Sequence, residues 1–109
     1  LCRYQNIQHA TWTALEVKRT IQCAVAHWPV AGGYAKALAI AVRESGLYWK
    51  ATNALSGACG IYQHLPRYWP SRVAAYPGLR LGPSCYNARS NVLVSIRMVH
   101  SGGWGPWGG

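Results

Sequence analysis

Acidic residues are almost missing from this sequence, which has no Asp and two Glu among its 109 residues. Without Asp, a Ser-His-Asp triad in its usual form is excluded, and no G-x-S-x-G motif is present either. Eleven Lys and Arg leave a formal net charge of +9, which is more than solubility alone requires. This imbalance favours a polyanionic partner or substrate, such as nucleic acid, acidic lipid or the polymers of bacterial walls.

Phenylalanine and long apolar runs are missing as well. The aromatic residues, 12% of the chain, are all Trp or Tyr, whose polar groups suit surfaces and clefts as well as cores. No apolar run reaches the length that crosses a membrane. Half of the residues are nevertheless hydrophobic, so we expect one folded domain over residues 1–109 and not a disordered chain.

Metal-ligand spacings are not found. The sequence has no C-x-x-C pair, and no His lies at zinc-finger spacing from a Cys. The four histidines share no metal-binding spacing; they are His9, His27, His64 and His100. A phosphate-binding loop is absent, and the basic residues are scattered instead of clustered on one helix. We therefore expect no metal, no cofactor and no nucleic-acid partner.

Four cysteines are present, and an even number in a small basic chain indicates two disulfides and an oxidising compartment. Three connectivities are possible. We favour Cys2–Cys23 with Cys59–Cys85, because this pairing closes two separate loops. The alternative of a nucleophilic Cys59 near His64 is less favoured, since an even number of cysteines leaves no free thiol.

Two helices are predicted in the first half of the chain. The segment 13–16, Thr-Ala-Leu-Glu, has the capping-box pattern and opens a run of helical periodicity over 13–28. Pro29 and the glycine pair that follows it end this helix. A second helix over 34–45 is apolar around most of its girth, which predicts a central, buried position. Gly46 is well placed to terminate it.

The second half is less regular. Residues 48–57 are predicted to be irregular, compatible with a small hairpin near 48–58, and residues 58–65 to form a short helix. The segment 66–86 has four prolines and is predicted to be a long ordered loop. A last helix is expected over 87–100, followed by a tail too rich in glycine for a regular element. The predicted fold is mainly α.

The two glutamates differ in their surroundings. Glu16 lies at the third position of the capping box, near the positive end of the helix dipole, which explains it structurally. Glu44 lies in a last helical turn, where the dipole and apolar neighbours both favour the neutral acid. A carboxylic acid that keeps its proton suits general acid catalysis, and an ion pair with a distant Arg is the structural alternative. None of its neighbours at helical spacing is a cation; they are Ile40, Ala41, Leu47 and Tyr48.

The surroundings of Glu44 resemble a known motif. Glu44-Ser45-Gly46, followed by the segment 56–63, Ser-Gly-Ala-Cys-Gly-Ile-Tyr-Gln, resembles the E-S-G … S-x-G-A-x-G-L-x-Q signature of soluble lytic transglycosylases. These enzymes belong with the goose-type lysozymes in the lysozyme-like superfamily. The segment 87–107 resembles the closing helix and Trp-rich end of actinobacterial secreted and phage-borne members. The resemblance covers roughly residues 34–107 and implies a single lysozyme-like domain with a substrate cleft.

The resemblance also implies a function. In that family the Glu of E-S-G is the catalytic acid, which assigns this role to Glu44, while Ser45 and Gln63 match residues at the sugar cleft. The implied activity is that of a muramidase, which cleaves the β-1,4 bond between N-acetylmuramic acid and N-acetylglucosamine. A lytic transglycosylase, which forms a 1,6-anhydro product, is favoured over a hydrolytic lysozyme, because most glycosidases need two carboxylates.

Further residues are expected to bind substrate. Tyr48, Ser56, Tyr62 and Trp104 are candidates, and Trp104 or Tyr62 is expected to orient Glu44. Five aromatic residues are candidates either for sugar stacking or for core packing; they are Tyr48, Trp49, Trp69, Trp104 and Trp107.

The expected partners are peptidoglycan strands and anionic wall polymers, bound by a monomer. The chain starts at Leu1 and its single Met is Met98, so we expect a processed product or an excised domain that has lost any export signal. It is then secreted, or phage-borne, and acts on the cell wall. The alternative from another class is a non-catalytic cationic protein that binds walls or is antimicrobial, and such a protein would tolerate Glu44→Gln.

Overall fold

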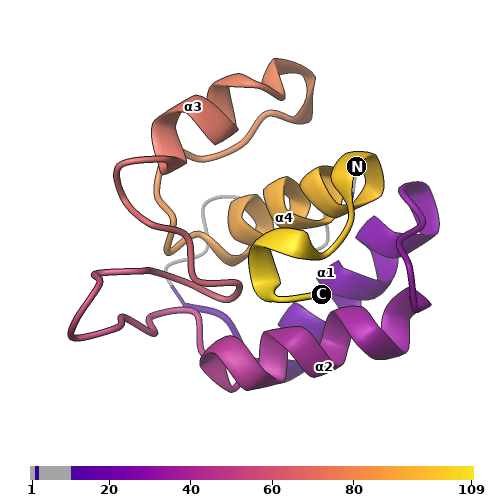
Figure 1. Ribbon diagram of the computed structural model, residues 1–109, viewed down its shortest axis with the longest axis horizontal. Helices are drawn as coiled ribbons and strands as arrows, with labels where there is room; N and C mark the ends of the chain where they lie inside the picture. Colours follow the sequence, from indigo (N-terminus) through magenta and orange to yellow (C-terminus); the bar gives the residue numbers. More distant parts are fainter. Residues whose placement is uncertain (1, 3–10) are drawn as a thin grey trace.

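The computed structural model describes Cys2 and residues 11–109, so that His9 lies outside the described part (Figure 1). No β-strand occurs among the described residues, and the prediction of a mainly α fold is confirmed there. No helix in this part is both long and apolar enough to cross a bilayer. The elements are α1 (Ala14–His27), α2 (Gly33–Ser45), α3 (Trp69–Ala74), α4 (Ala88–Gly102) and the one-turn 3-10 helices η1 (Pro77–Leu79) and η2 (Gly105–Trp107).

The central helix is α4, which packs against both α1 and α3. Figure 1 shows α3 on one side of α4 and α2 on the other. The prediction that the helix over 34–45 is the central one is therefore wrong. One face of the helix is buried through Ala37, Ile40 and Ala41, but Ala35 and Ala39 stay at the surface at little cost and Val42 is exposed. The centre is instead filled by α4, whose residues 88–96 are all buried.

The start of α1 has the predicted capping box. Thr13 Oγ1 accepts a hydrogen bond of 3.1 Å from the Glu16 backbone N–H, and Glu16 Oε1 accepts one of 2.9 Å from the Thr13 N–H. Two backbone donors that the helix leaves unpaired are satisfied in this way. The structural role expected for Glu16 is confirmed, and the apolar face of α1 is buried through Val17, Ile21 and Ala24.

The segment 58–65 is not helical, contrary to the prediction. Cys59 instead forms isolated bridges with Thr52 and with His64, partly where a small hairpin was expected. Gly60 has a φ of +82°, and a Cβ there would lie 2.3 Å from both the Asn91 amide and the Cys85 carbonyl oxygen. This tight approach to α4 turns the chain back, because a glycine with positive φ interrupts a helix.

Two segments predicted to be irregular contain short helices. Residues 66–86 hold α3 and η1, and the tail holds η2. Prolines did not prevent these helices because each has its Pro in the first turn, where the missing N–H is not needed. The tail is anchored by Trp107, which is buried and donates from Nε1 to the Tyr62 carbonyl oxygen over 2.8 Å.

The favoured disulfide pairing is confirmed. Cys2 and Cys23 are joined by an S–S bond of 2.04 Å, and Cys59 and Cys85 by one of 2.03 Å. The first bond ties Cys2 to α1, and the second ties the turn at Gly60 to the segment before α4. Each loop closure stabilises the fold by roughly 3 kcal/mol in the chain-entropy description.

Candidate active site

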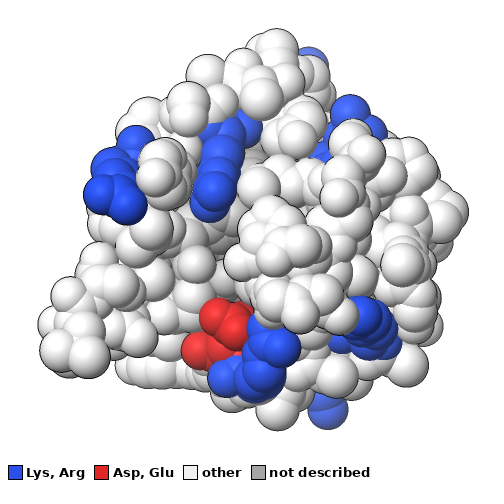
Figure 2. Space-filling view, in the orientation of Figure 1, with Lys and Arg blue, Asp and Glu red and all other residues white. Residues whose placement is uncertain are grey.

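Glu44 lies in the last turn of α2, and its side chain is 26% exposed. Figure 2 shows acidic surface where α2 ends, in contact with a basic side chain, and the neighbouring surface is hollowed. The carboxylate is thus open to solvent at the edge of a depression. Since the chain has one other acid, Glu16, and that residue caps α1, Glu44 is the carboxylate left for chemistry.

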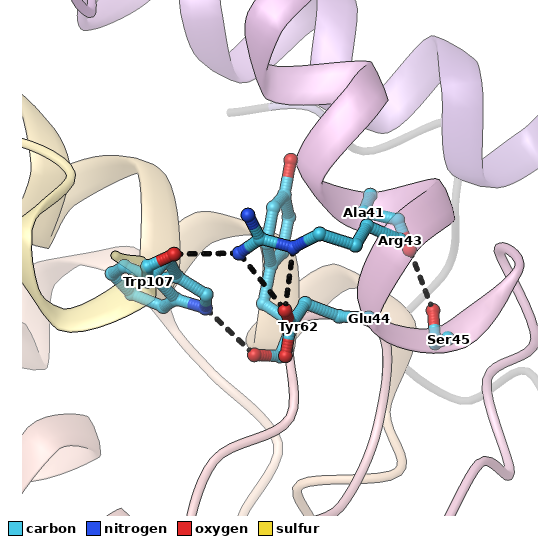
Figure 3. A network of polar contacts seen from close by, with 6 residues as sticks. All are labelled: Ala41, Arg43, Glu44, Ser45, Tyr62 and Trp107. Atoms are coloured by element: carbon cyan, nitrogen blue, oxygen red, sulfur yellow. Dashed lines mark hydrogen bonds and ion pairs between the residues drawn. The ribbon is translucent and has the colours of Figure 1, made fainter. Parts of the chain in front are cut away.

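A cation does contact Glu44, which corrects the expectation drawn from helical spacing. Arg43 Nε donates to Glu44 Oε2 over 3.0 Å, and Arg43 Nη2 donates to the Trp107 carbonyl oxygen over 2.6 Å (Figure 3). Spacing arguments consider the third and fourth neighbours along a helix, but the long Arg43 side chain reaches back to the adjacent residue. Glu44 Oε1 makes no hydrogen bond within the described part of the chain.

Arg43 therefore links the candidate catalytic group to the C-terminal tail. Its side chain is 53% exposed, so water screens the ion pair and its contribution to stability is small. The signal that could have revealed this partner was the adjacent position of Arg43 in the sequence.

Four of the predicted contact residues lie outside the core. Tyr48 is 54% exposed and Ser56 is exposed, so both are open to a ligand. Ser45 and Gln63 are half-buried and hydrogen-bonded within the protein. Ser45 Oγ donates to the carbonyl oxygen one turn back, at 3.1 Å. Gln63 Nε2 donates to the carbonyl oxygens of residues 51 and 60, at 3.1 and 2.9 Å, and so holds the turn in shape.

Tyr62 and Trp104 do not lie at the surface, where the prediction that they bind substrate requires them. Both are buried, and neither offers a surface to a sugar. Tyr62 donates its hydroxyl to the Ala37 carbonyl oxygen over 2.7 Å, and Trp104 donates Nε1 to the Ala31 carbonyl oxygen over 2.8 Å. Burial, with a smaller effect of Tyr34, raises the pKa of the Tyr62 hydroxyl above its usual range. Neither residue is hydrogen-bonded to Glu44, whose partner is Arg43.

The aromatic candidates for sugar stacking divide by exposure. Trp69, Trp104 and Trp107 are at most 8% exposed and belong to the core. Tyr48 and the half-buried Trp49 remain near the end of α2, with ring centroids 6.2 Å apart. These two rings are the stacking surface that the structure leaves available.

A buried polar network that the sequence did not predict joins Arg72, His64, Ser95 and Asn91. Arg72 Nη1 lies 2.9 Å from His64 Nδ1, and because a guanidinium can only donate, the ring proton is on Nε2. His64 Nε2 then donates to Ser95 Oγ over 2.6 Å, and Ser95 donates to the Asn91 carbonyl oxygen over 2.7 Å. Burial, and to a smaller extent Arg72, lowers the pKa of His64 from 6.5 to about 3.

This network is structural. His64 and Ser95 are both fully buried, so the pair cannot act on a substrate as base and nucleophile. The His64 ring packs edge-on against Trp69 and Trp107, with centroid distances of 5.0 and 5.8 Å. It thereby supports Trp107, whose carbonyl oxygen anchors Arg43.

Two other chemical hypotheses are excluded by the disulfides. Cys59 is bonded to Cys85, so it is not a nucleophile for His64. The sulfur atoms of Cys2 and Cys23 and a ring nitrogen of His27 lie within 4.8 Å of one another. These sulfurs are joined in a disulfide and are not thiolates, so the cluster does not bind a metal.

Comparisons of the chain with protein-family models, with curated proteins and with solved structures give no match. The function must therefore be argued from the residues around Glu44 and from the motif that contains them.

Proposed function

We propose that the protein is a peptidoglycan-cleaving muramidase of the lytic transglycosylase type, with Glu44 as general acid and then general base. The observation that carries the proposal is the position of Glu44, a partly exposed carboxylate at the edge of a surface hollow. The other acid of the chain is engaged in the cap of α1. The E-S-G motif around Glu44 supports the same substrate class.

The first step cleaves the glycosidic bond. Glu44 Oε1 donates its proton to the oxygen that joins N-acetylmuramic acid to N-acetylglucosamine. The bond from this oxygen to C1 of the muramic residue breaks, and its electron pair stays on the oxygen. The positive charge that develops at C1 is stabilised by the carbonyl of the substrate's own N-acetyl group. A second protein carboxylate is not needed for this step.

The second step closes the anhydro ring. The C6 hydroxyl oxygen of the muramic residue attacks C1, and its proton passes to the Glu44 carboxylate. Glu44 is then neutral again, and no water has been consumed. Both steps use one carboxyl group in two protonation states, which fits a chain whose remaining acid, Glu16, is a helix cap.

Arg43 is a positioning residue in this mechanism. It binds Glu44 through Oε2, and no hydrogen bond engages Oε1 within the described part of the chain. Its positive charge stabilises the carboxylate that exists between the two steps. Tyr48 and Ser56 are proposed to contact the sugar chain, and the net charge of +9 supports binding to anionic wall polymers.

The test is digestion of purified peptidoglycan by the wild type, by Glu44→Gln and by Glu16→Gln, with the products identified by mass spectrometry. Glu16→Gln is the matched control, because it removes the other acid while a Gln can still complete the capping box. We expect anhydro products from the wild type and from Glu16→Gln, and a loss of at least about a hundredfold in Glu44→Gln.

Other outcomes point to the alternatives. Reducing-end products, heavier by one water and lost in Glu44→Gln, would make the protein a hydrolytic lysozyme in which polar side chains hold the water. Equal digestion by Glu44→Gln would remove Glu44 from the mechanism. Absence of digestion by every variant, with binding to walls retained, would favour the non-catalytic cationic protein.

A further inference from the structure

A pocket of about 300 Å³ lies away from Glu44. Residues from the end of α1, the segment between α3 and η1, η1 itself and α4 line it; they are Trp28, Ala75, Tyr76, Gly78, Leu79 and Arg97. None of these lining residues belongs to the network around Glu44, so the pocket is a separate site. Its volume is at the lower end of those that hold small ligands.

Arg97 is the cation of this pocket, and two aromatic rings hold it. Its guanidinium carbon lies 5.5 Å from the centroid of Trp28 and 5.2 Å from that of Tyr76. Contact with ring faces fixes the guanidinium group while its N–H donors, which lie in its plane, stay available. In the part of the chain that the structure describes, Arg97 makes no hydrogen bond and no ion pair.

The other arginines that the structure describes as buried or half-buried have protein acceptors. Arg72 Nη1 is hydrogen-bonded to His64, and Arg89 donates to the carbonyl oxygens of Leu79 and Arg80. Arg97 is half-buried like Arg72 but lacks such a contact.

An internal carboxylate for Arg97 is not available either. Glu44 pairs with Arg43, and Glu16 caps α1. These are the two acids of the chain. The N–H donors of Arg97 are therefore not satisfied by a carboxylate side chain of the protein.

We propose that this pocket binds a small oxyanion, a carboxylate or a phosphate, carried by a compact group that packs on Trp28, Tyr76 and Leu79. The planar fork of a guanidinium matches the two oxygens of either anion. In a bacterial wall, such groups occur as the carboxyl ends of peptides and as the phosphates of anionic polymers. The proposal does not rest on cleavage by Glu44, because binding at Arg97 is measured directly.

The experiment titrates the full chain with two probes and follows NMR shifts of the tryptophan indole N–H groups. The probes are N-acetyl-D-alanyl-D-alanine, for a peptide end, and glycerol 3-phosphate, for a polymer phosphate. The dipeptide amide is the neutral control ligand. Arg97→Met keeps the apolar stem and removes the charge, and Arg97→Lys keeps the charge and removes the fork.

Arg67→Met is the matched control variant. Arg67 also stacks on an aromatic ring, 4.9 Å from the centroid of Tyr68, but it does not line the pocket. We expect at least one probe to shift the Trp28 indole signal, with affinity reduced about tenfold or more in Arg97→Met and less in Arg97→Lys. Arg67→Met and Glu44→Gln should bind like the wild type.

The outcomes separate clearly. Binding of the dipeptide alone assigns the pocket to peptide ends, and binding of the phosphate alone assigns it to polymer phosphates. The proposal is overturned if neither probe binds, if the amide binds as well as the acid, or if Arg67→Met loses as much affinity as Arg97→Met. An unchanged far-ultraviolet circular dichroism spectrum shows that Arg97→Met is folded; if it is not, Arg97→Lys alone decides.

Discussion

At the scale of single residues, Gly60 shapes the turn behind the candidate site. Its φ is +82°, and a Cβ added there would lie 2.3 Å from both the Asn91 amide and the Cys85 carbonyl oxygen, so there is no room for a side chain. Its own N–H donates to the Ala51 carbonyl oxygen over 2.9 Å. The glycine of the motif is thus required by packing against α4, independently of any substrate.

Gly60→Ala should lower the free energy of unfolding by about 2–4 kcal/mol, because left-handed strain adds to overpacking against α4. Gly57→Ala is the matched control. Gly57 has a similar φ of +76°, but a Cβ added there would lie 3.9 Å from its nearest neighbour, an atom of the Pro66 ring. The control should therefore cost about 1 kcal/mol. Urea unfolding measures both, and equal costs would contradict the packing argument.

Arg43 offers a second test at this scale. Arg43→Met removes the hydrogen bonds to Glu44 and to the Trp107 carbonyl oxygen. We expect kcat to fall a few-fold because Glu44 is held less firmly, with KM nearly unchanged because Arg43 is not proposed to contact the substrate.

Measurements of kcat and KM for glycan cleavage by the wild type, Arg43→Met and Arg43→Lys check this expectation. Arg43→Lys keeps a cation beside Glu44 and should recover part of the lost kcat. An unchanged kcat in Arg43→Met would mean that Arg43 does not position Glu44.

At the scale of elements, α3 depends on its neighbours. A helix of six residues is not stable alone. Trp69 fixes its start, since the ring is buried and Nε1 donates to the Pro83 carbonyl oxygen over 2.8 Å. Arg72 fixes its end through the 2.9 Å contact with His64. The element thus exists because the turn at Gly60 and α4 provide partners for it.

The His64 network predicts a dependence of stability on pH. The pKa of His64 is about 3 in the folded protein and near 6.5 when exposed, so between these values the unfolded chain binds a proton that the folded chain does not. The free energy of unfolding therefore decreases as the pH falls from about 6.5 toward 3, by on the order of 4 kcal/mol from this group. Above about pH 6.5 the group has no further effect.

His64→Gln should flatten this dependence. The variant is expected to be less stable at pH 7, because the contact with Arg72 is lost, but its stability should change less below pH 6.5. His27→Gln is the control, since His27 is exposed and should leave the slope unchanged. Urea unfolding at a series of pH values gives the slopes, and equal slopes for His64→Gln and the wild type would refute the assignment.

At the scale of the whole molecule, the excess of positive charge has a structural consequence. With two acids for eleven Lys and Arg, most cations cannot form an internal ion pair. Arginines in the interior instead use carbonyl oxygens and aromatic rings, as Arg89 and Arg97 do. The fold is held by apolar packing, two disulfides and polar contacts of α4.

Local signals in the sequence determined several features. The capping box of α1, the glycine that ends α2 and the limits of α4 follow from residues that are neighbours along the chain. The disulfide pairing followed from closing two separate loops. The capping role predicted for Glu16 is also confirmed, because a capping box needs only four consecutive residues.

Other features depend on tertiary contacts between residues that lie far apart in the sequence. The contact of Arg43 with the Trp107 carbonyl oxygen joins residues 64 positions apart, and the hydroxyl of Tyr62 reaches Ala37 across 25. Burial of an aromatic ring, a turn forced by close packing at Gly60, and the pocket around Arg97 all depend on which elements meet in space. No local sequence pattern encodes these tertiary contacts. Whether a given side chain faces the core or the solvent is decided only when the helices pack against one another.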